Sequence, residues 1–260
     1  MARKVDNTRQ RIVSLAPNVT SILVALGAWR ELVGVSKWCK DVAPVGRLPQ
    51  VPQVGDCWKL DVAEVMRLRP TLLVGSVPFA PETMEKLLAQ PVAFLAINPR
   101  SLADVENDIR TLARLVSRAA AGEKLIARMR RTSDEIARVA AKLPRRRKPR
   151  VYCEAWPNPR ISSPPWVAEI VALAGGKFVV APGKRVSDDE VVRAKPDVII
   201  LAWTATGDRA SPARMLADPA FRDVPAVKNR RVIVIRDELL NTPGPPLMQG
   251  ARELFRAIHT

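Results

Sequence analysis

The chain has very few of the side chains on which most enzymes and metal proteins rely. Its 260 residues include one histidine, three cysteines and one tyrosine. The histidine, His259, is the penultimate residue, where chain ends usually fray, which argues against a Ser-His-Asp or Cys-His mechanism. Cys39, Cys57 and Cys153 lack the C-x-x-C spacing of a structural zinc site, and the spacing leaves only a Cys39–Cys57 bridge open. We therefore expect no metal site and no disulfide framework.

Long apolar runs and nucleotide motifs are also absent. No stretch of about 18 uninterrupted apolar residues occurs, so we expect no membrane-spanning segment. The N-terminal segment carries basic side chains but no apolar run of signal-peptide length, so nothing in it directs export. The lack of G-x-G-x-x-G and G-K-[ST] motifs disfavours a nucleotide site, and the acidic residues near predicted strand ends form no catalytic pair. The sequence therefore predicts neither an enzyme nor a catalytic cofactor.

Acidic residues are outnumbered by basic ones. There are 26 Asp and Glu against 42 Lys and Arg, which gives a formal net charge of +16, while the apolar share of 47% is normal for a packed core. Such a charge suggests a different class of function, the binding of phosphate backbones or anionic lipid head groups. No helix-turn-helix or RNP-like aromatic pattern accompanies it, so nucleic acid is not the expected partner. The basic residues concerned are Arg110, Arg114, Arg118, Arg128, Arg130, Arg131, Lys142, Arg145, Arg146, Arg147, Lys148 and Arg150.

Short β-branched runs alternate with amphipathic stretches from residue 11 to about residue 118. This alternation is typical of parallel sheets that are covered by helices. The expected strands are 11–15, 32–36, 71–75 and 91–97, and the expected helices are 20–26, 61–69, 81–89 and 102–117. A sustained helical pattern then begins after a break at Gly122 and ends near residue 143, with one apolar stripe and a strongly charged remainder.

The second half of the chain repeats the strand–helix alternation. We expect strands at 150–154, 177–180, 198–202 and 231–236, with helices at 166–174, 187–193 and the C-terminus. The predicted fold is α/β, with two Rossmann-like lobes of parallel sheet joined by a single long helix. The predicted divisions are a basic tail (1–10), an N-terminal lobe (11–118), a bridging helix with a basic linker (119–149) and a C-terminal lobe (150–260).

One segment of the first lobe has a counterpart in the second. Residues 61–74 align with residues 187–200 at an offset of 126, which places Glu64 on Glu190 and Pro70 on Pro196. The alignment favours two related lobes. The alternative is that helix–proline–strand units resemble one another wherever they occur, because proline ends helices and β-branched residues follow in the strand.

Tryptophans gather where the strands are expected to end. In an open parallel sheet ligands bind beyond the carboxyl ends of the strands, and large aromatic faces suit planar or bulky apolar ligands. The alternative is that these rings plug the ends of the sheets. The loops after predicted strands or before helices hold Trp38, Trp58, Trp156 and Trp203, and Trp166 begins a helix.

Three longer motifs resemble a known family. They are RIVSLAPNVTSILVALG, PQVGDCWKLDVAEVMRLRPTLLVGS and EAWPNPRISSPPWVAEIVALAGG. The chain resembles, over about residues 11–258, the cobalamin-binding branch of the substrate-binding proteins that serve iron-siderophore and cobalamin ABC importers. The resemblance implies the class III periplasmic-binding-protein fold, a cobalamin-like corrinoid held in the cleft between lobes, and an ABC permease as partner. A ferric siderophore is the alternative ligand.

The resemblance also implies a location and an assembly state. It implies a periplasmic or extracytoplasmic monomer, although without a signal peptide a cytoplasmic location stays open. Since His259 is the only histidine, a preformed chelate is favoured over a bare metal ion. Carried over by position, the expected ligand contacts are Trp38, Cys57, Trp58, Trp156, Pro157, Arg160 and Trp166. Trp203 and Asp237, which follow later predicted strands, complete the candidate site.

The family docks on its permease through one carboxylate on each lobe, placed seven residues before the proline that precedes a strand. In the second lobe this position is Asp189. In the first lobe it is Ala63, and the adjacent Glu64 is rotated by about 100° around the helix. The resemblance therefore assigns Asp189 and Glu64 to transporter docking, with the first lobe departing from the family pattern.

Overall fold

The computed structural model describes residues 10–42, 48, 50–55, 59–76, 79–144, 147–204, 206 and 210–260. The chain divides into two compact units. Unit 1 comprises the chain up to Pro99 together with Glu106–Ile126, and unit 2 comprises Arg100–Val105 with Ala127–Thr260. Each unit has its own five-stranded sheet. The prediction of two α/β units is confirmed, whereas the predicted boundaries near 118 and 149 stay predictions.

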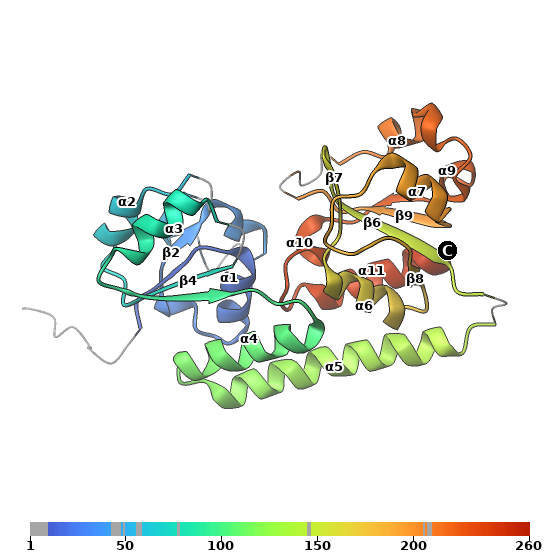
Figure 1. Cartoon of the computed structure of the whole chain (residues 1–260). Helices are drawn as coiled ribbons and strands as arrows, with labels where there is room; N and C mark the ends of the chain where they lie inside the picture. The colour runs from blue at the N-terminus through green and yellow to red at the C-terminus, as the bar shows by residue number, and fades with distance from the viewer. Residues whose placement is uncertain are drawn as a thin grey trace, which may run out of the picture. The chain divides into compact units, whose positions relative to one another are not determined.

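Unit 1 contains a parallel sheet with the strand order β3-β2-β1-β4-β5. The aliphatic strands β1 and β4 inside the sheet are buried because helices cover it, as is usual for parallel sheets (Figure 1). Val65 and Leu87, from two of these helices, pack against Val13 and Leu73 of the sheet. The elements are β1 (Ile12–Ser14), α1 (Pro17–Ala25), η1 (Trp29–Glu31), β2 (Leu32–Ser36), η2 (Lys37–Asp41), β3 (Gln53–Val54), α2 (Val62–Arg67), β4 (Leu72–Ser76), α3 (Pro81–Leu88) and β5 (Ala93–Ile97).

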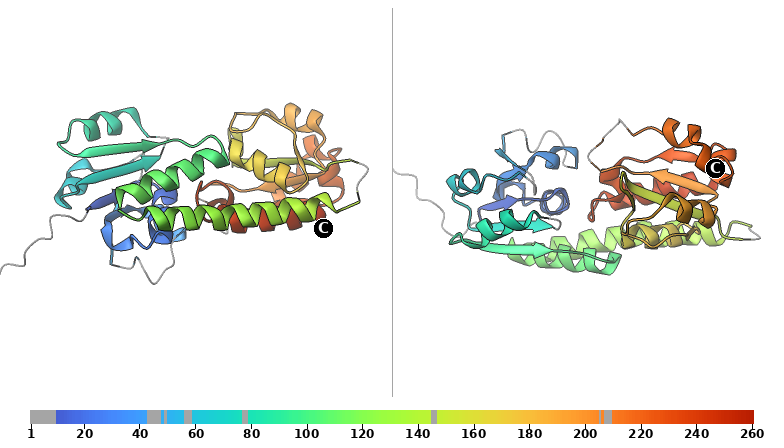
Figure 2. Two further views of the ribbon diagram at one scale, coloured as in Figure 1. Left: turned by 90° about the horizontal axis from the view of Figure 1, so that it is seen from below. Right: turned by 45° about the horizontal axis from the view of Figure 1, so that its top comes forward.

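Two long helices follow, α4 (Leu102–Leu115) and α5 (Ala119–Ala141). Figure 2 shows α5 in green as one continuous helix. The predicted break at Gly122 is wrong, since Gly122 lies inside α5. A Cβ atom on Gly122 would lie 2.6 Å from the Cβ of Ala113. The glycine is needed for the close approach of α4 and α5 rather than for a chain break.

Filling this contact should destabilise unit 1. We expect Gly122→Val to lower the free energy of unfolding by about 1 to 3 kcal/mol, because the added side chain collides with Ala113. Ala120→Val is the matched control, because Ala120 is exposed on the same helix. Urea denaturation monitored by circular dichroism measures both. Equal losses in the two variants would show that the helix contact is not the cause.

Unit 2 contains a mixed sheet with the order β10-β9-β6-β7, in which β8 also pairs with β6. The expectation of a wholly parallel sheet is corrected by β7, which is antiparallel to β6. Strand β6 continues three residues beyond Glu154 and turns back as a hairpin, where the sequence pattern suggested a loop. The elements are β6 (Arg150–Pro157), β7 (Arg160–Ser162), α6 (Pro165–Leu173), β8 (Lys177–Phe178), α7 (Asp188–Ala194), β9 (Val198–Leu201), α8 (Ala213–Ala217), η4 (Pro219–Phe221), α9 (Pro225–Lys228), β10 (Val232–Val234), α10 (Asp237–Leu240) and α11 (Leu247–His259).

The predicted repeat extends to the topology of the sheets. The strand order β2-β1-β4-β5 of unit 1 corresponds to β8-β6-β9-β10 of unit 2. Helices α2 and α7 start 126 residues apart, as do strands β4 and β9. Arg69 and Lys195, at the same offset, both adopt a left-handed backbone with φ of 47° and 43°. The two segments therefore share local geometry, and the resemblance is closer than that of two unrelated helix–strand units.

The C-terminus is held in place by α11. The expectation that the chain end frays is wrong, because the His259 Nε2 atom forms a hydrogen bond of 2.7 Å with the backbone oxygen of Ala174. The His259 ring also lies 4.3 Å, between centroids, from the ring of Phe255. Within the described part of the chain, no helix combines the length and apolar character needed to cross a bilayer.

Candidate ligand-binding site

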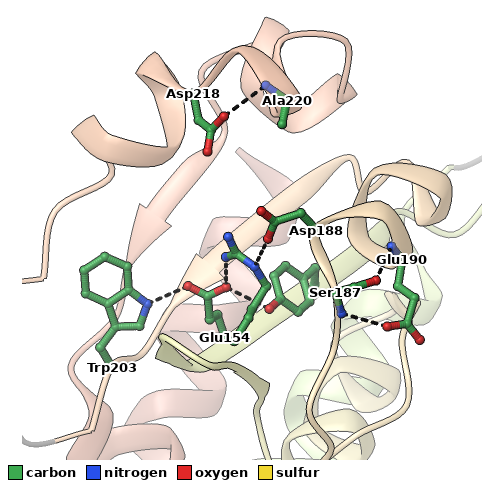
Figure 3. Close-up of polar contacts among 9 residues, drawn as sticks. Glu154, Ser187, Asp188, Glu190, Trp203, Asp218 and Ala220 are labelled. Atoms are coloured by element: carbon green, nitrogen blue, oxygen red, sulfur yellow. Dashed lines mark hydrogen bonds and ion pairs between the residues drawn. The ribbon is translucent and has the colours of Figure 1, made fainter.

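A hollow of about 260 Å³ opens in unit 2 at the carboxyl ends of β6 and β9. This is the edge of an α/β sheet where ligands usually bind. Its lining includes Glu154, Pro157, Arg160, Asp188, Trp203, Arg214 and Asp218, and Figure 3 shows several of these side chains converging. We refer to it as the Glu154 pocket.

Glu154 lies at the base of this pocket and is completely buried. The Tyr152 hydroxyl donates to Glu154 Oε2 at 2.8 Å, and the Trp203 indole Nε1 donates to Oε1 at 2.8 Å (Figure 3). Arg160 forms an ion pair with the same carboxylate. A buried carboxylate is tolerated only when it is paired and hydrogen-bonded, and all three donors meet this need. Glu154 thereby connects Tyr152, Arg160 and Trp203 into one rigid group.

Arg160 bridges two carboxylates. Besides its ion pair with Glu154, its Nε donates to Asp188 Oδ1 at 2.8 Å, and its guanidinium carbon lies 5.0 Å from the centroid of the Phe221 ring. Burial acts to lower the pKa of Arg160, but the charge of Glu154 and the hydrogen bonds to both carboxylates outweigh it and raise the pKa. The arginine therefore stays charged and is held in one orientation.

Tyr152 supplies the hydroxyl that Glu154 accepts. The ring is buried in the core of unit 2, next to Ile199 and Phe221. Burial raises the pKa of Tyr152 well above its ordinary value, and the negative charge of Glu154 raises it further. The phenol is consequently a permanent donor and is not available as an anionic ligand for a metal.

The rim of the pocket is polar and carries charges of both signs. Helix α7 begins at this rim with a capping box, in which Glu190 N donates to Ser187 Oγ at 3.2 Å and Ser187 N donates to Glu190 Oε2 at 2.7 Å. Asp218 is held by the backbone amide of Ala220, which donates to Oδ1 at 2.9 Å (Figure 3). The lining has two arginines against three carboxylates, so it is no basic funnel for anions.

Three predicted contacts line the Glu154 pocket, namely Pro157, Arg160 and Trp203. Trp156 is close in sequence but 39% exposed, and its indole donates to the Asn158 backbone oxygen at 2.8 Å. Asp237 is half-buried in the first turn of α10 and is not part of the lining.

The structure places Trp166 in the interior of unit 2. Its side chain is 8% exposed, and its indole donates to the Leu240 backbone oxygen at 2.9 Å. This leaves little aromatic surface exposed, and the hydrogen bond ties α6 to the end of α10, while the predicted ligand contact of Trp166 stays a prediction. Its burial favours the alternative in which a tryptophan plugs the sheet end, and the variants described in the Discussion test the choice.

Unit 1 contributes one described aromatic candidate. Trp38 is half-buried in η2, directly after β2, and the Lys37 ammonium lies 4.7 Å from its ring centroid. Cys57 and Trp58 lie outside the described residues, so their predicted roles stay predictions. Cys39 is a buried free thiol that accepts a hydrogen bond of 2.9 Å from Thr20. Burial raises the pKa of Cys39, which disfavours the reactive thiolate, and the predicted Cys39–Cys57 bridge stays a prediction because Cys57 lies outside the described residues.

The docking candidates lie on equivalent helices. Asp189 is exposed in the first turn of α7, and Ala63 is exposed at the equivalent position of α2. Glu64, one residue further, is only half-buried and follows the Asp61 side chain that caps the helix. The assignment of Asp189 and Glu64 to docking stays a prediction.

The most connected residue of the pocket, Glu154, was not among the predicted contacts. Sequence spacing contained a signal, because Tyr152 and Glu154 lie two residues apart and so face the same side of a strand. Asp188, Arg214 and Asp218 were also missed, since nothing in the sequence brings α7 and α8 to the end of β6.

A larger hollow of about 740 Å³ lies elsewhere in unit 2, between the end of α5 and α6. Its lining is mostly alanine and leucine, with Lys148 and Glu169 as the charged members. Size alone would favour it, but it lacks convergent polar groups and is remote from the carboxyl ends of the strands. In the described residues, no group of three or more His, Cys, Asp or Glu could hold a metal ion.

Most of the chain matches a known protein family in sequence. The family described as periplasmic binding protein matches residues 12–239. The chain belongs to this family. As a periplasmic binding protein, it is a substrate-binding protein of the ABC transporter type. The α/β fold with one parallel and one mixed sheet agrees with this assignment.

Several known proteins are similar to it, and two of them are named for different ligands. An uncharacterized ABC transporter substrate-binding lipoprotein of Bacillus subtilis is 24% identical, with coverage of 96% of this chain and 80% of the relative. A vitamin B12-binding protein of Vibrio parahaemolyticus is 24% identical over 94% and 88% of the two chains. The solved periplasmic heme-binding protein RhuT of Roseiflexus sp. RS-1 has 27% identity and a TM-score of 0.81, covering 96% and 98%.

Proposed function

We propose that this periplasmic binding protein captures cobalamin or a related corrinoid for ABC-type uptake, using the Glu154 pocket as part of its binding surface. The mixed charge of that pocket is the main observation that supports a corrinoid as the ligand. Two arginines and three carboxylates line it, together with the Trp203 ring. A corrin ring bears neutral amide side chains, which both donate and accept hydrogen bonds and so suit a lining of mixed charge.

Heme is the strongest competitor, because a heme-binding protein is among the similar structures. Heme iron is commonly held by histidine or tyrosine, and heme also carries two anionic propionates. The only histidine is engaged with Ala174 at the end of α11, and the only tyrosine is buried and donates to Glu154. Neither side chain is placed to ligate iron, and the pocket has no excess of positive charge for the propionates. Cobalamin brings its own axial ligand and needs neither.

A ferric siderophore is the second alternative. Catecholate chelates are anionic and require a basic site, whereas carboxylates outnumber arginines in this pocket. The excess of carboxylates over arginines in the pocket therefore disfavours ferric catecholates. The function proposed here is binding and delivery to a permease, with no chemical step on the ligand.

Direct binding tests the proposal. Purified protein is incubated with cyanocobalamin, desalted and examined by visible spectroscopy, in parallel with hemin and a ferric catecholate. Retention of the corrin spectrum, with submicromolar affinity by calorimetry, is the expected result. Tight binding of hemin or the ferric chelate without cobalamin would reject the proposed ligand while leaving the family assignment intact.

Trp203 should contribute directly to corrinoid affinity. We expect Trp203→Ala to weaken cobalamin binding by about 1 to 3 kcal/mol, the usual loss for an aromatic contact at a binding hot spot. Trp203→Phe keeps a ring but removes the N–H that Glu154 accepts, so its loss should be smaller. Calorimetry on both variants, with Trp29→Ala as a control in unit 1, separates the two contributions. Unchanged affinity in Trp203→Ala would place the ligand outside this pocket.

A further inference from the structure

Corrinoid binding does not account for the net charge of +16 of the chain. Part of this positive charge is concentrated on one helix face. The exposed side chains Arg128, Arg131 and Arg138 lie on α5, three and ten residues apart from the first, and the exposed Lys142 follows directly after the last residue of the helix. At about 100° per residue the three arginines fall within an arc of about 80° and extend over about 15 Å, and Lys142 continues the row beyond the helix end. We refer to these four residues as the α5 basic stripe.

The stripe lies away from the packed face of its helix. Met129, Thr132 and Ile136 are buried on the inner side of α5, so the orientation of the helix is fixed by its core contacts. No ion pair involves the four cations within the described residues. Glu135 is the carboxylate within the same arc, which leaves the stripe with a net charge of +3. The charges therefore face solvent in a fixed line.

We propose that the α5 basic stripe docks the protein on the surface of an anionic lipid bilayer. A straight row of cations on a rigid helix can contact many lipid head groups at once, and basic residues near an anionic membrane contribute additively. Val139, 43% exposed, lies beside Arg138 in the sequence and next to the stripe on the helix. An exposed apolar side chain among cations suits the head-group boundary, as in interfacial helices.

Nucleic acid would need other features. Proteins that bind it either insert a helix into a groove or stack bases on aromatic side chains. The stripe and its flanks hold no aromatic residue from Arg128 to Lys142. The inner face of α5 is packed, which limits how deeply the helix can enter a groove. An anionic bilayer fits these constraints better, since it requires only an exposed face.

Vesicle co-sedimentation with the full chain tests the inference. Phosphatidylcholine vesicles with and without phosphatidylglycerol are compared at low and high salt. We expect binding to the anionic vesicles alone, lost at high salt. Each cation removed should weaken binding about fivefold, so Arg131→Glu with Arg138→Glu should weaken it about 25-fold or more.

The controls separate the stripe from net charge and from misfolding. Arg67→Glu with Lys86→Glu makes the same charge change on α2 and α3, where both residues are exposed, and should leave most binding intact. If the double glutamate variant does not fold, it is replaced by Arg131→Gln with Arg138→Gln. The thermal midpoint of each variant shows whether it is folded. Equal losses in the unit 1 control, equal binding to neutral vesicles, or tighter binding to duplex DNA that the stripe variants abolish would each overturn the inference.

Discussion

Replacing Glu154 by alanine should lower the free energy of unfolding by about 3 to 5 kcal/mol, the usual cost of breaking a buried ion pair. The carboxylate is completely buried and holds Arg160, Tyr152 and Trp203 together. Its removal leaves the partly buried Arg160 guanidinium with Asp188 as its remaining carboxylate partner. It also leaves the hydrogen-bond donors of Tyr152 and Trp203 without an acceptor. Leaving buried polar groups unpaired costs more than losing an average hydrogen bond.

A double-mutant cycle distinguishes this mechanism from a simple cavity. Glu154→Gln keeps an acceptor of similar shape and should cost less than Glu154→Ala. Adding Arg160→Met to Glu154→Gln should cost less than the sum of the two single changes, because neither charge is then left unpaired. Urea denaturation of the unmodified protein, the two single variants Glu154→Gln and Arg160→Met, and the double variant measures the coupling free energy between the two side chains. Strict additivity would show that the buried ion pair does not hold the pocket together.

Trp166→Ala should also lower the free energy of unfolding by about 3 to 5 kcal/mol, as expected for removal of a large buried ring. The side chain is 8% exposed, and the indole N–H bonds to the Leu240 backbone at 2.9 Å. Trp156→Ala is the matched control, because that ring is 39% exposed and its N–H bonds only to the neighbouring turn. Trp156→Ala should lower the free energy of unfolding by less than about 1 kcal/mol.

The same two variants discriminate a structural role from a binding role. At a temperature where Trp166→Ala remains folded, we expect it to bind cobalamin nearly as tightly as the unmodified protein. Trp156→Ala should be stable, and any loss of affinity would then reflect direct contact. A stable Trp166→Ala that fails to bind ligand would restore Trp166 to the binding surface.

The order of strands and helices was largely predictable from the sequence. Buried parallel strands are continuous aliphatic runs, and Pro17 and Pro165 at the starts of α1 and α6 are typical helix-start residues. The repeat at an offset of 126 is visible in the letters because both copies need a capping residue, a left-handed helix end and a proline before the strand. These are local requirements, so short stretches of chain specify them.

Other features depended on contacts between distant segments. Gly122 resembles a helix breaker in the sequence, but in the structure it allows Ala113 to approach, and the hairpin of β6 and β7 is seen only once Glu154 is placed opposite Ser162. Tryptophan positions near strand ends were evident from the sequence, but their exposure was not, so Trp203 and Trp166 looked alike.

Residue patterns alone specify the fold class and the positions of most strands and helices, and the scarcity of histidine and tyrosine limits metal chemistry. Which residues form the pocket depends on the folding of distant segments onto one another. This folding brings Arg160 from β7 and Trp203 from beyond β9 to one buried carboxylate on β6, and Asp188 from α7 to Arg160. Local propensity acts over a few residues, whereas burying a charge requires donors from several strands and helices, and those meet only when the sheet has formed.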